Sequence, residues 1–117
     1  MLTYVFDIDG TICEKVDNGD YSKAKPIKAR IDVVNALYDS GNTIIFQTAR
    51  GMGRSGNSAA YAHSAFYELT RMQLISWGVK FNDLFLGKPA GDVYIDDKGI
   101  GDNEFFDIQE KIQKSGD

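Results

Sequence analysis

Residues 4–12 read YVFDIDGTI, an apolar run followed by two aspartates one residue apart and then by a glycine and a threonine. The apolar residues 2–6 predict a short strand that is buried on both faces inside a sheet. Asp7 and Asp9 stand where that strand ends. Burying a carboxylate without a partner costs several kcal/mol, close to the whole stability margin of a small domain. The two charges therefore require compensation from outside this stretch.

The composition predicts one globular domain over residues 1–117. A chain of this length buries roughly two-thirds of its unfolded surface when it folds. The content of 43% hydrophobic and 26% charged residues is ordinary for a soluble protein. The net charge of −4, with no cluster of lysine or arginine, disfavours a nucleic-acid partner.

Cysteine usage and hydropathy point to a reducing compartment. The single Cys13 excludes an internal disulfide. The sequence has neither the pattern of a signal peptide nor an apolar stretch near the ~20 residues of a membrane helix. We therefore expect a cytoplasmic protein with no membrane partner.

Strands alternate with helices along the chain, which predicts an α/β fold with a Rossmann-like, mostly parallel sheet flanked by helices. Asn18-Gly19 fits a tight turn and predicts a small projecting hairpin. The expected elements, in chain order, are a strand at 2–6, the hairpin at 13–25, a helix at 26–41, a strand at 43–47, a glycine-rich loop to about residue 58, a helix ending at residue 78, strands at 85–87 and 93–95, and a helix at about 104–114.

The first two predicted helices each carry apolar residues at helical spacing. We expect these residues to form the faces that pack on the sheet. They are Ile27, Ile31, Val34 and Tyr38 in the first helix, and Tyr61, Ala65, Leu69, Met72 and Ile75 in the second.

Polar residues follow each of the four predicted strands. The carboxyl ends of parallel strands border one crevice, so we expect these side chains to line a single cleft. They are Asp7 and Asp9 after the first strand, Thr48 after the second, Lys88 after the third, and Asp96 and Asp97 after the fourth.

Each of these residues has an ordinary structural explanation when it is taken alone. An aspartate after a strand is often a turn residue or a helix cap, a lone threonine is usually a satisfied loop hydroxyl, and a lone lysine is usually solvated. Together, the carboxylates suit Mg²⁺, which prefers oxygen ligands and shares its shell with water and a phosphate. Lys88, the Thr48 hydroxyl and backbone amides near Gly10 suit the oxygens of a phosphate group. The combination predicts a Mg²⁺ site that binds a phosphate ester.

The ordered set resembles the four motifs of the haloacid dehalogenase superfamily. This resemblance implies that Asp7 is a nucleophile that becomes an aspartyl-phosphate and that Asp9 is the general acid/base. It implies that Thr48 and Lys88 bind the transferring phosphoryl group. The motifs in this chain are DIDGT at 7–11, the apolar strand that ends in Thr48, Lys88 in GKP, and Asp96-Asp97 after VYI.

The resemblance also implies how Mg²⁺ is held. The doubled acid leaves open which of Asp96 and Asp97 touches the metal. The implied ligands are Asp7, the backbone carbonyl of Asp9, and Asp97, with Asp96 and Asp102 supporting the metal from outside its first shell.

Members of the superfamily often carry a cap domain, inserted either after the first motif or between the second and the third. In this chain the first position holds only residues 13–25, and the second holds one loop and one helix, so we expect a capless member. QTARG at 47–51 and YIDDK at 94–98 are similar to phosphatases of bacterial capsular polysaccharide biosynthesis. This similarity implies a small substrate such as a sugar phosphate, and leaves a homo-oligomer open.

Residues 51–56, GMGRSG, also match the glycine pattern of a dinucleotide-binding loop. However, three residues separate the glycines from the strand, and Glu68, the only acid at a suitable distance, lies inside a predicted helix. A flexible loop that uses glycine for its turns is the simpler interpretation. Ala49, Arg50 and Arg54 are then candidates to contact the substrate.

A signalling receiver domain is another alternative, because it has a similar length and also uses strand-end acids, a hydroxyl and a lysine. Such a domain carries its phosphorylated aspartate at the end of a middle strand, where this chain has Thr48. We expect Cys13 to be a small buried thiol rather than a nucleophile, because no local base or cationic cluster marks it. His63 is predicted to lie on a helix surface.

Overall fold

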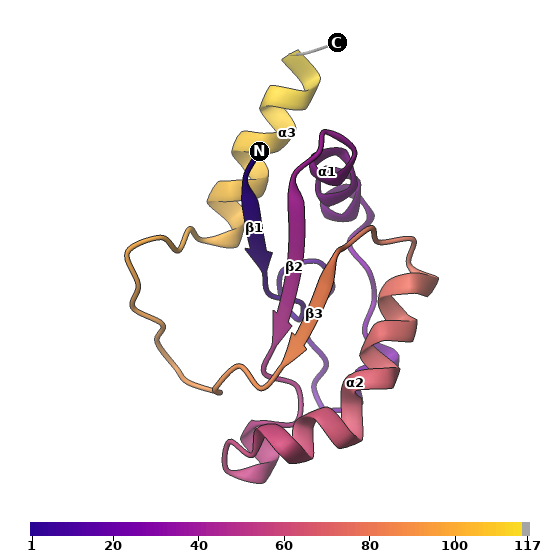
Figure 1. Ribbon diagram of the computed structural model, residues 1–117, viewed down its shortest axis with the longest axis vertical. Helices are drawn as coiled ribbons and strands as arrows, with labels where there is room; N and C mark the ends of the chain where they lie inside the picture. Colours follow the sequence, from indigo (N-terminus) through magenta and orange to yellow (C-terminus); the bar gives the residue numbers. More distant parts are fainter. Residues whose placement is uncertain (116–117) are drawn as a thin grey trace.

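The computed structural model describes residues 1–115, which form a three-stranded parallel sheet with three helices (Figure 1). The predicted α/β fold with a parallel sheet flanked by helices is confirmed. The strands are β1 (Thr3–Phe6), β2 (Thr43–Thr48) and β3 (Asp83–Leu86), paired in the order β1-β2-β3. The helices are α1 (Lys28–Asp39), α2 (Ala59–Ser76) and α3 (Asp102–Ser115), and two 3-10 turns are η1 (Tyr21–Lys23) and η2 (Gly53–Ser55).

The register of the sheet aligns the carboxyl ends of the three strands. Phe6 in β1 lies opposite Phe46 in β2, and Thr48 in β2 lies opposite Leu86 in β3. The residues that follow β1, end β2 and follow β3 therefore lie at one edge of the sheet.

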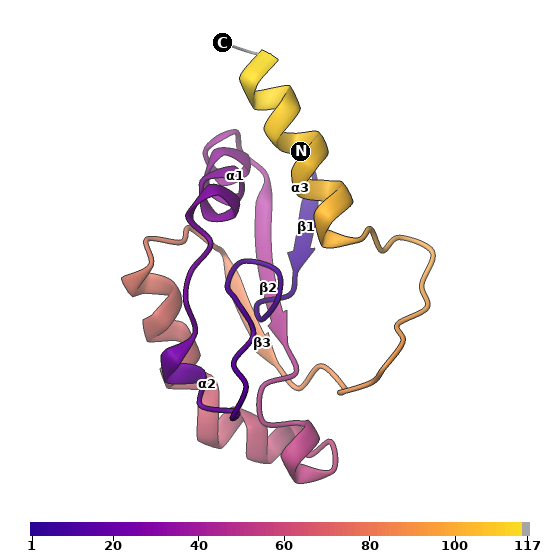
Figure 2. The same ribbon diagram turned by 180° about the vertical axis from the view of Figure 1, so that it is seen from behind.

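The helices pack on one face of the sheet and leave the other face open. In Figure 1 the open face is toward the viewer, and Figure 2 shows the helix side. Val5 and Phe85 on the open face are 55% and 56% exposed, so the predicted burial of the strands on both faces is wrong. The core on the covered face includes Phe6, Phe46 and Leu84 from the strands, Val34 from α1, Leu74 from α2 and Phe106 from α3.

The inward face of α2 also differs from the predicted one. The predicted apolar row from Tyr61 to Ile75 is exposed along its length. The polar residues Thr70 and Gln73 turn inward instead, because they hydrogen-bond Arg50. The fully buried residues of α2 are Ala62, Thr70 and Leu74.

The predicted strand at 93–95 is wrong in this structure. Residues 87–101 form neither helix nor strand and arc away from the sheet between β3 and α3 (Figures 1 and 2). Val93 and Ile95 are 74% and 92% exposed. Tyr94 bonds within its own segment, where its hydroxyl donates to the Pro89 carbonyl at 2.6 Å. Without a fourth strand, β1 is an edge of the sheet.

The predicted hairpin has a paired base but no strands. Cys13 forms an antiparallel bridge with Pro26, and Glu14 N–H donates to the Lys25 carbonyl at 2.9 Å. The chain between these pairs is a loop that contains η1. Neither this loop nor the segment between β2 and α2 is large enough for a cap, so the part of the chain that the structure describes is a capless core. None of its helices is long and apolar enough to cross a membrane.

Candidate functional site

Three neighbouring strand ends bring Asp7, Thr48 and Lys88 together. The Lys88 ammonium donates to Asp7 Oδ2 at 3.1 Å. The backbone N–H of Lys88 donates to the Thr48 carbonyl at 3.2 Å, which continues the β2–β3 pairing beyond the strands. The sequence predicted these three residues in one place, and the structure puts them there because parallel strands end at the same edge.

The Thr48 hydroxyl is at this edge but is almost fully covered. Thr48 as a whole is 1% exposed, and its Oγ1 accepts a hydrogen bond from the backbone N–H of Arg50 at 3.1 Å. The hydroxyl hydrogen is left to donate. Ala49, the next residue, is only half-buried.

A tight turn follows Asp7, in which the N–H groups of Thr11 and Ile12 both donate to the Ile8 carbonyl. Gly10 has φ +80°, a conformation that other L-residues rarely adopt, and a Cβ there would lie 2.7 Å from Lys15 Cε. The Gly10 N–H donates to the Cys13 carbonyl at 2.8 Å. This amide, a predicted phosphate donor, is therefore already engaged inside the turn.

Asp9 is bound by Arg50 in a two-pronged ion pair. Arg50 Nε donates to Asp9 Oδ2 at 2.8 Å, and Arg50 Nη2 donates to Asp9 Oδ1 at 2.9 Å. The Arg50 side chain has no exposed surface, so it does not reach a substrate as the sequence predicted. Planar guanidinium and carboxylate groups match in this geometry, which makes such pairs stronger than single hydrogen bonds.

The glycine loop at 51–56 packs against the loop at 14–25. Arg54 Nη2 donates to the Gly19 carbonyl at 2.7 Å, and its guanidinium lies 5.3 Å from the Tyr21 ring centroid and 4.9 Å from that of Phe66. A Cβ on Gly51 would lie 2.7 Å from Phe66. Arg54 therefore holds the two loops together, and Gly51 lets its loop pack closely against α2. Gly51 and Gly56 have φ of +79° and +64°, so these two glycines serve the turns of the loop, as its simpler interpretation predicted.

Cys13 is a buried thiol beside Asp9, as predicted. Its Sγ–H lies 3.5 Å from Asp9 Oδ1 and 3.6 Å from the Ile8 carbonyl. Burial raises the pKa of Cys13 from 9.0 to about 12, and the charge of Asp9 acts in the same direction. The thiol stays protonated and is a poor nucleophile.

We expect Cys13 to resist alkylation in the folded protein. A rise in its pKa of about three units leaves about 1000-fold less thiolate at pH 8 than an ordinary cysteine has, and burial slows access further. The measurement is the rate of reaction with a coloured disulfide reagent, first in buffer and then in guanidinium chloride. Rapid and complete modification without denaturant would contradict the expectation.

Asp102 ties α3 to the rest of the fold. Arg30 on α1 donates to Asp102 Oδ2 at 2.7 Å and to the Thr11 carbonyl at 3.0 Å. The hydrogen bond from Arg30 lowers the pKa of Asp102. The start of α3 is therefore held beside the turn that follows β1. Local sequence patterns do not reveal this role of Arg30, because its partners are distant in the chain.

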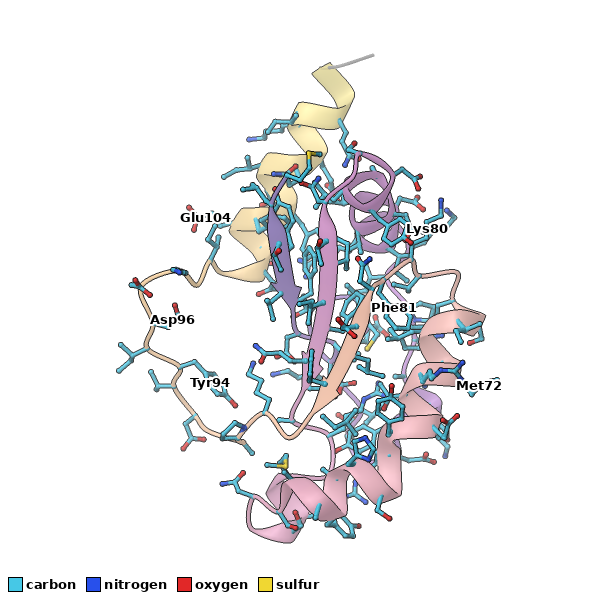
Figure 3. All side chains as sticks on the ribbon, viewed as in Figure 1. Met72, Lys80, Phe81, Tyr94, Asp96 and Glu104 are labelled. Atoms are coloured by element: carbon cyan, nitrogen blue, oxygen red, sulfur yellow. The ribbon has the colours of Figure 1, made fainter. Side chains whose placement is uncertain are left out.

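Asp96 and Asp97 are exposed residues of the segment at 87–101. Figure 3 shows Asp96 on the part of this segment that arcs away from the sheet. Asp96 Oδ1 accepts from the Gly99 N–H at 3.0 Å within that loop. His63 is exposed on α2 and stacks on Tyr67 with ring centroids 4.6 Å apart, which confirms its predicted helix-surface position.

The arrangement as it stands does not fit the implied Mg²⁺ site. Among residues 1–115, no three His, Cys, Asp or Glu side chains gather in a group that could hold a metal ion. Asp7 and Asp9 each face a basic side chain, Lys88 and Arg50 respectively. Of the implied ligands, Asp97 is an exposed residue of the segment at 87–101 and is not grouped with Asp7 and Asp9.

Three solved structures share this fold. A structural-genomics target from Vibrio cholerae superposes with a TM-score of 0.83 at 21% identity and covers 100% of both chains. The D,D-heptose 1,7-bisphosphate phosphatase of B. bronchiseptica, complexed with magnesium and phosphate, gives 0.53 at 17% identity over 97% of this chain and 64% of that one. A chain of the Pnkp1/Rnl/Hen1 complex gives 0.57 at 19% identity over 96% of this chain and 34% of that one.

No protein-family model matches this chain, and no curated protein matches it by sequence. At these identities the likeness to solved structures lies in the fold. The chain shares with these proteins a small α/β fold with a parallel sheet, which agrees with the fold class that the motifs implied.

Proposed function

We propose that this chain hydrolyses phosphomonoesters with Asp7 as the nucleophile. The proposal rests on the pair between the Lys88 ammonium and the Asp7 carboxylate, and on the backbone hydrogen bond that places Thr48 beside Lys88, at the ends of three parallel strands. The fold shared with a D,D-heptose 1,7-bisphosphate phosphatase supports it.

In the proposed reaction an Asp7 oxygen attacks phosphorus, and the bond between phosphorus and the ester oxygen breaks. Lys88 touches Asp7, so its ammonium reduces the repulsion between the anionic nucleophile and an anionic phosphate. The Thr48 hydroxyl donates to a phosphoryl oxygen. In its protonated form Asp9 gives a proton to the leaving oxygen. The resulting carboxylate, the form that is paired with Arg50, then takes a proton from the water that cleaves the aspartyl-phosphate. Phosphate and the free alcohol leave, and both aspartates return to their starting states.

The proposed substrate is a small sugar phosphate or a related precursor of capsule or polysaccharide synthesis. This part of the proposal rests on QTARG and YIDDK in the sequence. It is compatible with a core that has no cap over the strand ends in residues 1–115.

We also propose that the reaction uses Mg²⁺, which would supply positive charge beside the acids and the phosphate. Asp7, the carbonyl of Asp9 and Asp97 would hold it, with Asp96 in support. This requires residues 93–97 to leave their exposed position.

Two features favour such a movement. The edge of β1 is unpaired, and residues 93–95 are exposed and apolar, which suits an added parallel strand. Arg30 holds Asp102 beside the carbonyl of Thr11, near the end of β1. Asp97 precedes Asp102 by five residues, so the chain between Asp97 and Asp102 spans at most about 17 Å. A strand at 93–95 parallel to β1 would end at the edge where Asp7 lies.

We expect phosphate release from a panel of sugar, polyol, amino-acid, nucleotide and aryl phosphates, and we expect EDTA to abolish it. Asp97→Ala should raise the Mg²⁺ concentration needed for half-maximal rate at least about tenfold. Asp92→Ala, at the other end of the same segment, is the matched control. Hydrogen exchange should show protection of residues 92–97 when Mg²⁺ and phosphate are added together.

Full activity after exhaustive metal removal, with no change in exchange at residues 92–97, would contradict the metal proposal. A higher Mg²⁺ requirement in Asp96→Ala but not in Asp97→Ala would reverse the roles of the two acids.

A further inference from the structure

Arg50 is a buried charged side chain whose three side-chain nitrogen atoms all donate hydrogen bonds. Besides its two bonds to Asp9, its Nη1 donates to Thr70 Oγ1 at 3.2 Å and to Gln73 Oε1 at 2.7 Å. The guanidinium carbon lies 4.9 Å from the centroid of the Tyr21 ring. These contacts fix the guanidinium in position and in plane.

The same contacts join three parts of the chain. Thr70 and Gln73 belong to α2, and Gln73 Nε2 donates to the Tyr21 carbonyl at 2.6 Å. The Tyr21 hydroxyl accepts from Gly51 N–H at 3.1 Å. The orientation of the Asp9 carboxylate therefore depends on one side chain that is held by α2 and by the loop at 14–25.

Substrate binding does not explain Arg50, because its side chain has no exposed surface. A purely structural role does not require a partner that is open to solvent, and the Asp9 side chain keeps 22% of its surface exposed. Both oxygens of this partly exposed carboxylate are directed by a fully buried group. Such an arrangement fixes the geometry of a reacting group before the substrate arrives.

We propose that Arg50 is a positioning residue that holds the Asp9 carboxylate in its working orientation. The inference rests on the proposed function, in which Asp9 transfers protons. Arg50 acts through Asp9 and does not touch the substrate. Its loss should reduce kcat while KM changes little.

The test is a double-mutant cycle between Arg50→Met and Asp9→Asn, followed with an aryl phosphate. Arg50→Met should lower kcat about 100-fold and change KM less than about threefold. The double variant should be no slower than Asp9→Asn alone, because both changes remove the same function. Losses that multiply in the double variant would overturn the inference.

Arg54→Met is the matched control. Arg54 contacts the same Tyr21 ring but has no contact with Asp9 among the described residues. The fold-losses in kcat caused by Arg54→Met and by Asp9→Asn should multiply in the variant that carries both changes. The free energy of unfolding is measured for every variant, and Arg50→Lys provides a second cycle that keeps the buried charge. Lysine lacks the planar fork, so it should restore stability more than kcat.

A spectroscopic measurement separates this inference from the proposed function. The Arg50 Nε–H resonance in a nitrogen-proton NMR spectrum should shift in Asp9→Asn and stay in place in Arg54→Met. If the wild-type chain releases no phosphate from any ester, the proposed function fails, whatever this resonance does. If the chain is active and the resonance ignores Asp9→Asn, the inference about Arg50 fails alone.

Discussion

Asp7→Asn is expected to abolish turnover of every phosphate ester, with a loss of at least about 10⁴-fold. An amide does not attack phosphorus at a useful rate, and no other carboxylate among the described residues contacts Lys88. The variant should still fold, because Asp7 is partly exposed and its pair with Lys88 is worth less than about 1 kcal/mol. The measurement is phosphate release together with a thermal melt.

Asp39→Asn is the matched control for this change. It removes another lysine–aspartate pair, Lys80 Nζ to Asp39 Oδ1 at 2.8 Å, which lies at the opposite end of the sheet. We expect no change in kcat. Substantial turnover by Asp7→Asn, or trapping of phosphate on another residue after acid quenching, would show that Asp7 is not the nucleophile.

Asp9→Asn is expected to slow the two chemical steps unequally. A sugar alkoxide leaves poorly without a proton, whereas nitrophenolate leaves readily as the anion, so the first step should be slow only for the sugar phosphate. The second step needs a base for either substrate. With p-nitrophenyl phosphate the variant should therefore release about one nitrophenolate per site in a burst and then turn over slowly.

Rapid-quench kinetics with both esters in saturating Mg²⁺ measures these steps. Arg50 loses one carboxylate contact in this variant, and breaking a buried ion pair costs on the order of 3 kcal/mol, so the folded fraction is determined first. The burst is scaled to folded protein. Equal losses in the first step for the two esters, with no burst, would remove Asp9 from the acid/base role.

The strand-end residues illustrate what can be predicted from a sequence. An apolar run that breaks off into polar residues marks the end of a buried strand, and parallel strands end at a common edge. Asp7, Thr48 and Lys88 follow this rule, and the structure brings them together. The helices α1, α2 and α3 were expected because their periodicity is local to each segment.

Two predictions were wrong because the local pattern does not determine whether a strand pairs or which face of a helix is buried. Residues 93–95 have the composition of a strand, but the edge of β1 stays unpaired and Tyr94 bonds to Pro89 instead. The apolar row of α2 was expected to face the core. The helix is turned so that Thr70 and Gln73 reach Arg50, because a buried guanidinium must be hydrogen-bonded.

The roles of Arg50 and Arg54 differ most from expectation. In the sequence both are basic residues in a glycine-rich loop, which indicates contact with an anionic substrate. The structure buries Arg50 against Asp9 and stacks Arg54 on Tyr21. Neither partner is close in sequence, since Asp9 is 41 residues from Arg50. The long, flexible arginine side chain lets either role follow from the same local pattern.

The sequence by itself determined the α/β class, three of the four strands that it predicted, and the carboxylate, hydroxyl and ammonium groups at their ends, because these depend on short-range periodicity and strand polarity. Only the tertiary structure decided which face of α2 is buried, which arginine holds Asp9, and where Asp96 and Asp97 lie. These outcomes depend on contacts between segments far apart in the chain, where competing partners differ by a few kcal/mol that no local pattern records.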